Sequence, residues 1–172
     1  MADDLSLARQ VLAAQPFSAL LGAEITQFGE GQAELRIAVT DKLRQQHGFV
    51  HGGVLSYAAD NAITFAGGSA LGPAVVTAEF KINYVRPALG EFLIARAIVV
   101  HAGKRQAVCR CDIISVSEGR ESLCALAQGT ISALSQGQNG AALRSTGRAG
   151  SCLLIGQYLA GAPVTLDVRP RV

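Results

Sequence analysis

Four strand-like segments after residue 74 place the strongest constraint on what this chain can fold into. In the first, VVTAEFKINYVR (75–86), apolar and polar residues alternate, which is typical of a strand with one buried side. Its apolar face comprises Val76, Ala78, Phe80, Ile82 and Tyr84. After short turns come EFLIARAIVVH (91–101), QAVCRCDIISV (106–116) and ESLCALAQGTISAL (121–134). We predict four long strands that form an antiparallel meander.

One earlier segment is long enough to cover such a sheet. From His51 to about Ser69 alanines dominate, and the apolar residues fall within one half of a helical wheel, which predicts a long helix. Upstream, AEITQF and GQAELRIAVT indicate a hairpin, and DDLSLARQVLAAQPF and FSALLG indicate two short helical segments ended by Pro16 and Gly22. One sheet of about six strands with one long helix along it is an α+β fold.

The composition indicates one domain that buries part of its surface by self-association. The 172 residues suffice for a single core, and 49% of them are apolar while only 16% are charged. Residues 1–134 carry 11 basic and 12 acidic side chains, which argues against a general nucleic-acid surface. The segment 135–172 contains six Gly, four Arg and one Asp, and we expect it to be a loose C-terminal tail outside the domain 1–134.

Two further features limit the cellular setting. The sequence shows no basic-then-apolar leader and no apolar run near 18 residues, so we expect a cytoplasmic protein that neither enters nor spans a membrane. The four cysteines, Cys109, Cys111, Cys124 and Cys152, do not form two pairs at metal-ligand spacing. We interpret them as reduced core residues, with a redox role as the alternative.

Asp60 is the only charged side chain between Gln45 and Ala78, and it falls inside the predicted long helix. Its neighbours one turn away on the same stripe are Ser56 and Thr64. That stripe holds small polar residues and not one long charged side chain. Such a composition favours a face packed against another element or another chain, with a solvated face as the alternative.

Asp60 is too far from the start of the helix to share a small site with it in one chain. His51 and Asp60 are nine positions apart, which is about 180° of rotation and about 13 Å of rise. The His51-Gly52-Gly53 start leaves backbone N–H groups at the positive helix end, where they can hold a developing oxyanion, although many such glycine pairs are plain turns. If both features serve one site, a second copy must supply one of them, which gives two sites per homodimer.

Three segments together carry a resemblance to a known family: HGGVLSYAADNAITFA (51–66), TAEFKINYVRPALG (77–90) and HAGKRQAVCRCDIISVSEGRESLCALAQGT (101–130). They resemble the hotdog-fold acyl-CoA thioesterases, in the branch that includes the phenylacetate-pathway thioesterase, and the likeness extends from about residue 20 to about 133. The resemblance implies a hotdog fold, a long central helix wrapped by an antiparallel sheet. It also implies a hydrolase of acyl-CoA thioesters that works as a homodimer or homotetramer and needs no metal or redox cofactor.

The resemblance implies a role for individual residues. Asp60 is the general base or nucleophile towards the thioester, the Gly52 N–H binds the thioester carbonyl, and His51 shapes that turn. Gln45, six residues before the His, stands where relatives usually carry Asn, so the amide is kept on a longer arm. Thr77 matches a Ser or Thr that holds the attacking water, with an ordinary outward-facing strand residue as the alternative.

Substrate binding is assigned more loosely. CoA carries phosphates, for which the turn residues Lys104 and Arg105 are candidates together with Arg86, although each could be a solvated charge. Gly53 allows a ligand to approach the backbone closely. We expect the acyl pocket to be lined by the far end of the central helix and a loop of the partner.

Two other functions stay open on the sequence. A non-catalytic hotdog protein could bind acyl-CoA or acyl carrier protein as a sensor or scaffold. A hotdog dehydratase would act on hydroxyacyl thioesters, but it requires a His and an acid in a different arrangement, and His51 beside Gly52 favours a structural role for that His.

Overall fold

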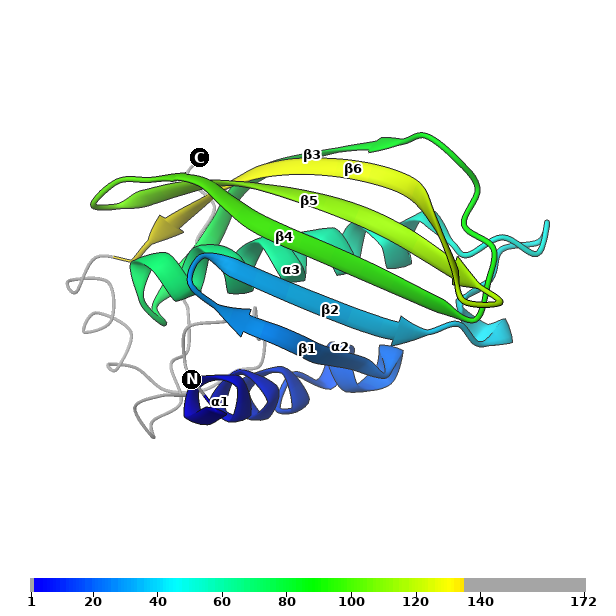
Figure 1. Cartoon of the computed structure of the whole chain (residues 1–172), viewed down its shortest axis with the longest axis horizontal. Coiled ribbons are helices and arrows are strands. Elements are labelled where there is room, and N and C mark those ends of the chain that lie inside the picture. Colours follow the sequence, from blue (N-terminus) through cyan, green and yellow to red (C-terminus); the bar gives the residue numbers. More distant parts are fainter. Residues whose placement is uncertain (1, 135–172) are drawn as a thin grey trace, which may run out of the picture.

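The structure is a computed structural model that describes residues 2–134; the predicted loose tail, 135–172, lies outside the described residues. The described part contains three α-helices, a short 3-10 helix and six strands. In chain order these are α1 (Ala2–Ala13), α2 (Pro16–Leu21), β1 (Ala23–Gly29), β2 (Gln32–Ala38), the 3-10 helix (Asp41–Leu43), α3 (Gly52–Leu71), β3 (Val75–Tyr84), β4 (Phe92–Ala102), β5 (Gln106–Ser117) and β6 (Arg120–Ala133). The predicted α+β composition is confirmed (Figure 1).

Local sequence sets the ends of the helices. His51 caps α3, because its Nδ1 accepts the N–H of Gly53 over 2.9 Å. Gly22 ends α2 in the left-handed conformation, with φ of 62°. The first helix ends before Pro16, as predicted: α1 ends at Ala13, and Pro16 is the first residue of α2. A proline is well tolerated there because the N–H at that position has no partner within the helix.

The strand order is β1-β2-β4-β5-β6-β3, and all neighbours are antiparallel. The predicted four-strand meander is therefore wrong for β3, which pairs with β6 at the sheet edge, while β4 pairs with β2 and β5. The cause is the connection 85–91, which is not a tight turn. Pro87 cannot donate to a strand ladder, and Gly90, at φ of 143°, leaves no room for a Cβ against the Val116 carbonyl. The connection thus carries the chain from the edge to the middle of the sheet (Figure 1).

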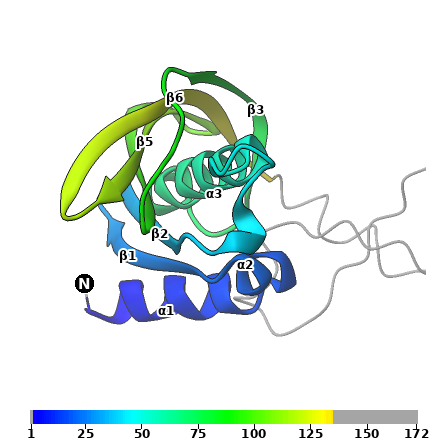
Figure 2. The same ribbon diagram turned by 90° about the vertical axis from the view of Figure 1, so that its right-hand side faces the viewer.

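Helix α3 lies along the inner face of the curved sheet and packs against it (Figure 2). Gly67 permits this close approach, because a Cβ at that position would lie 2.7 Å from Ile131 of β6. Every residue of the predicted apolar half of the helix is buried: Val54, Leu55, Ala58, Ala59, Ala62, Ile63, Phe65 and Ala66. Across residues 2–134, the helices are too short or too polar to span a membrane.

Three cysteines lie in this core. Cys109, Cys111 and Cys124 are buried free thiols, which confirms the prediction of reduced core residues for these three; Cys152 lies outside the described residues. Burial raises the pKa of the Cys109 thiol to about 11, and it raises the pKa of Cys111 as well. Protonated, enclosed thiols of this kind are poor nucleophiles.

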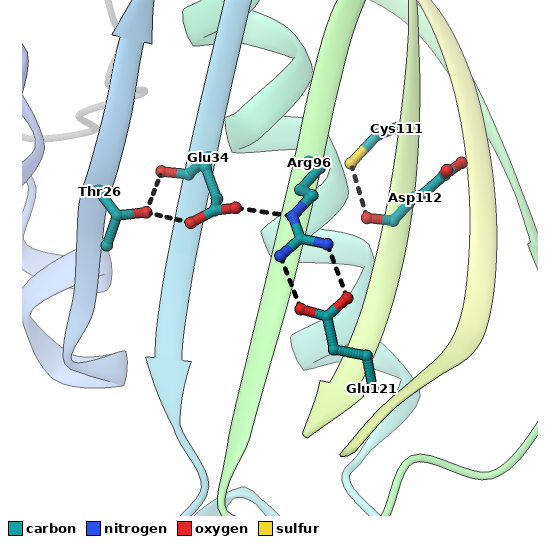
Figure 3. Close-up of polar contacts among 6 residues, drawn as sticks. All are labelled: Thr26, Glu34, Arg96, Cys111, Asp112 and Glu121. Atoms are coloured by element: carbon teal, nitrogen blue, oxygen red, sulfur yellow. Dashed lines mark hydrogen bonds and ion pairs between the residues drawn. The ribbon is translucent and has the colours of Figure 1, made fainter. Parts of the chain in front are cut away.

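The outer face of the sheet carries a chain of polar contacts centred on Arg96 of β4 (Figure 3). Its guanidinium donates to Glu34 of β2 over 2.7 Å and to both carboxylate oxygens of Glu121 of β6, at 2.7 and 2.8 Å. Thr26 of β1 donates to Glu34 in turn, over 2.7 Å. The Arg96 side chain is 43% exposed, so these pairs tie strands together with a small stabilisation, about 1 kcal/mol or less each.

The two edges of the sheet are built differently. Helix α1 packs along β1, and Arg9 donates from Nε to the Ile25 carbonyl oxygen over 2.9 Å. On the other edge β3 pairs with β6, and no other segment of residues 2–134 pairs with its outer side. One edge is thus covered by the chain's own helix, and the other presents a ten-residue strand.

Candidate active site

Asp60 lies in the middle of α3 and contacts two threonines. Thr77 of β3 donates from Oγ1 to Asp60 Oδ1 over 2.8 Å. Thr64, one turn further along α3, donates to the main-chain carbonyl of Asp60 over 2.7 Å, and its Oγ1 lies 2.9 Å from that of Thr77. The carboxylate is half-buried, while Thr64 is only 1% exposed. The sequence placed Thr64 next to Asp60 but gave it no role of its own.

A β-bulge turns Thr77 towards Asp60. The pairing of β3 with β6 shifts between Thr77 and Glu79, so Ala78 is the extra residue. Before the bulge Val75 and Thr77 face the helix, and after it the inward positions change parity. The predicted apolar face is therefore wrong at Val76 and Ala78, which are half-buried and exposed. The alternative of an outward-facing Thr77 is also wrong.

The surroundings of Asp60 favour a carboxyl group that can take up a proton. Burial raises its pKa above the ordinary value, and the hydrogen bond from Thr77 opposes this with a smaller effect. Within residues 2–134 no cation forms an ion pair with Asp60.

The start of α3 offers one free backbone donor. The N–H of Gly53 is taken by His51 Nδ1, whereas the Gly52 N–H has no acceptor among the described residues. The approach to this turn is fixed, because the His51 N–H donates to the Leu43 carbonyl over 2.8 Å and the Val50 N–H to the Ala88 carbonyl over 3.1 Å. The Gly52 N–H is therefore available to bind a ligand at the positive end of the helix dipole.

Tyr84, at the end of β3, clamps this first turn. Its hydroxyl donates to the Gly52 carbonyl over 3.1 Å and lies 2.7 Å from Ser56 Oγ. Sequence reasoning missed this contact, since alternation placed Tyr84 on an apolar face while its side chain is exposed. The one feature of the sequence that pointed to this part of the helix was that Ser56 lies on the same polar stripe as Asp60. The pairing of Tyr84 with Gly52 required the strand order, which the sequence did not reveal.

The structure brings some predicted site residues together and separates others. Gln45, Gly52 and Arg86 line one hollow of about 390 Å³. Asp60 lies eight positions along α3 from Gly52, about 12 Å away along the axis at 1.5 Å per residue. The helix start and the carboxylate are thus held apart in one chain, as the spacing predicted.

Two further groups of predicted residues lie elsewhere. His51 and Gly53 line a hollow of about 320 Å³ beside the helix start. Lys104 and Arg105 line an open hollow of about 590 Å³ at the β4–β5 hairpin, near the opposite end of α3 (Figure 1). In the part of the chain that the structure describes, no three His, Cys, Asp or Glu side chains group closely enough to hold a metal ion.

Comparison with known proteins places this arrangement in a family of thioester hydrolases. Residues 47–122 match the family model described as thioesterase superfamily. Acyl-coenzyme A thioesterase PaaI of Escherichia coli K12 is 35% identical over 96 residues, which are 55% of this chain and 68% of that protein. A thioesterase family protein from Silicibacter pomeroyi superposes with a TM-score of 0.70 at 37% identity, over 74% of this chain and 95% of that one.

The structure of the E. coli PaaI protein from the phenylacetic acid degradation operon agrees as well, with a TM-score of 0.65 at 28% identity over 76% of this chain and 96% of that one. The matched region contains the α3 start, Asp60 and the β3 edge. The six-stranded antiparallel sheet around one long helix is the hotdog arrangement that the resemblance implied. The chain belongs to the thioesterase superfamily, in the branch of the phenylacetate-pathway thioesterase.

Proposed function

We propose that the protein hydrolyses acyl-CoA thioesters to the free acid and CoA, at two sites formed between the copies of a homodimer. The observation that carries this proposal is the half-buried Asp60 carboxylate, which has no ion-pair partner among residues 2–134 and is held by Thr77 on the open edge strand. The name of the E. coli relative, acyl-coenzyme A thioesterase, supports CoA as the carrier.

In this proposal Asp60 acts as general base and Thr77 orients it. Asp60 takes a proton from water as the water oxygen attacks the thioester carbon, and the carbonyl oxygen becomes negative. The Gly52 N–H donates to that oxygen. When the C–S bond breaks, the CoA sulfur leaves with the proton, and the products are a carboxylic acid and the thiol. Attack by Asp60 itself, through a mixed anhydride, is the alternative route.

The distance between the two groups requires a second copy. Asp60 and Gly52 are about 12 Å apart along α3, whereas the attacking water and the carbonyl oxygen belong to one small reacting centre. Thr77 lies on β3, whose outer edge is unpaired within residues 2–134. Association of two copies along this edge around a two-fold axis would bring Gly52 of the partner subunit to Asp60, and would do so twice.

The same two-fold symmetry would bring the basic residues of the two copies to one binding site. Lys104 and Arg105 lie near one end of α3 and Arg86 near the other, and the 20-residue helix is about 30 Å long. In a two-fold dimer with antiparallel α3 helices, the basic hairpin of one copy approaches the helix start of the other. We assign these cations to the CoA phosphates, and Gln45 to the thioester carbonyl or the water.

The alternatives are weaker on specific contacts. A dehydratase would use a His together with an acid; His51 accepts the Gly53 N–H through Nδ1, which gives this nitrogen a structural role and leaves only Nε2 for proton transfer. A non-catalytic acyl-CoA or acyl carrier protein binder has no need of a half-buried carboxylate without a paired cation, which costs solvation free energy.

The test is hydrolysis of a panel of CoA thioesters with thiol release followed colorimetrically. Asp60→Asn keeps the size of the side chain and should lower kcat by about 100- to 10,000-fold. Since burial already disfavours the charged form, the folded state should not lose stability at neutral pH. Asp41→Asn, an exposed acid outside the site, is the control.

Retention of most of the rate by Asp60→Asn would refute the catalytic assignment. Binding of CoA thioesters by the wild type without any turnover would favour the non-catalytic binder, and hydration of crotonyl-CoA would favour the dehydratase.

A further inference from the structure

A separate apolar pocket of about 320 Å³ lies between α1 and the C-terminal half of α3. Its floor is formed by Phe28 of β1 and Phe65 of α3, whose rings meet edge to face with centroids 6.0 Å apart. Gly68 contributes no side chain to the lining, which keeps the space open. The lining also includes the acids Asp4 and Glu30, while its apolar side chains, Val75 among them, suit an apolar ligand group.

This pocket adjoins the Asp60 cluster at Thr64, whereas Asp60 and Thr77 do not line it. Thr64 belongs to its lining, and the Thr64 hydroxyl lies 2.9 Å from that of Thr77, which donates to Asp60. A ligand whose reacting carbon stood at the Asp60 carboxylate could therefore extend an apolar group past Thr64 into the pocket. The pocket shares no lining residue with the hollow at the basic β4–β5 hairpin.

Helix α1 forms the outer wall. Leu7 and Val11 are four positions apart, so they share one face of α1, and both line the pocket. The helix is held in place by the buried Ala8 and Leu12 and by the hydrogen bond from Arg9 to β1. The wall nearest the pocket is therefore a fixed part of the same chain.

We infer that this pocket takes the acyl group of the thioester and that Leu7 and Val11 of α1 set the largest acyl group accepted. This inference rests on the proposed function and replaces the expected partner loop with a helix of the same chain as the wall. A volume of about 320 Å³ is at the small end for ligand pockets, so the acyl group is a medium-length aliphatic or a single aromatic ring.

The test compares two opposite changes at one position. Val11→Phe fills the pocket and Val11→Ala enlarges it, and kcat/KM is measured for acetyl-, butyryl-, hexanoyl-, octanoyl- and decanoyl-CoA. Val11→Phe should lower kcat/KM for the largest accepted chain by about tenfold or more relative to acetyl-CoA, and Val11→Ala should extend the range. Ala13→Phe, on an exposed position of the same helix, is the matched control and should leave the profile unchanged.

A chain-length profile that keeps its shape in both variants would overturn the inference and leave the pocket to another occupant, such as a second copy or residues from 135–172. Binding of octanoate and decanoate, measured by calorimetry, separates this result from failure of the proposed function. If no thioester is cleaved but Val11→Phe abolishes binding of these acids, the hydrolase proposal fails and the pocket assignment stands. If binding is unchanged as well, the pocket assignment also fails.

Discussion

The two edge strands of the sheet, β1 and β3, differ in what lies against them. Along β1 the chain places its own helix α1, and Arg9 takes up the carbonyl of Ile25. The outer side of β3 has no partner among residues 2–134, although β3 carries Thr77, which donates to the candidate catalytic acid Asp60. An exposed, ten-residue edge strand is a hazard for aggregation unless it has a partner. The difference indicates that one edge is completed within the chain and the other by a second copy.

Among the changes that test this difference, the largest effect is expected for loss of the Gly52 N–H, the donor that the second copy would bring to the β3 edge. Gly52→Pro removes the N–H of the first α3 residue and adds a ring, at a position where proline is favoured. His51, at φ of −63° and ψ of 134°, already has a conformation compatible with a following proline. We expect kcat to fall by about 100-fold or more, since an oxyanion donor is lost.

Gly52→Ala is the matched control for this substitution. It keeps the N–H, and its Cβ would meet the Tyr84 ring at an ordinary 3.6 Å. Equal losses in the two variants would show that the backbone donor is not the group that matters. Thermal melting checks that both variants remain folded.

The next largest effect should separate the two edges directly. Lys81→Asp puts a second acid two positions from Glu79 on β3, and a two-fold contact between two β3 strands would bring these acids close to the acids of the second copy. We expect the dimer dissociation constant, measured by analytical ultracentrifugation, to rise by about tenfold or more, and activity to fall on dilution. Gln27→Asp on β1 should change neither quantity. Equal sensitivity of the two edges would show that β3 is not the edge at which two copies associate.

A smaller effect should appear in the pH dependence of Thr77→Val. Asp60 must be ionised to act as a base, so kcat/KM falls as pH drops through its pKa, which burial raises above the ordinary value. The hydrogen bond from Thr77 lowers that pKa, and its removal should therefore move the acid limb of the profile to higher pH. A limb that stays in place or moves to lower pH would contradict the role given to Thr77.

The sequence predicted those parts of the fold that depend on periodicity. The long helix, its buried half and the first hairpin follow from patterns within one segment, and the structure confirms them. The lone Asp60 was also visible, because an acid without charged neighbours stands out in composition. Its distance from Gly52 followed from helix geometry alone.

The parts that sequence reasoning missed depend on contacts between distant segments. The place of β3 beside β6 depends on pairing between segments that are far apart in the sequence, and the alternation within each segment does not record it. The bulge at Ala78 reverses the alternation within a single strand, so a strict period of two misplaces Val76. The Tyr84 clamp on Gly52 depends on that strand order.

Complementation between two variants shows whether each site takes Asp60 from one copy and Gly52 from the other. Asp60→Asn and Gly52→Pro are co-expressed with different affinity tags, and the heterodimer is purified and assayed. We expect one intact site in two, and so about half of the wild-type activity per dimer, although each homodimeric variant is nearly inactive. A heterodimer as inactive as its two parents would show that both groups act within a single chain, and the shared site would be refuted.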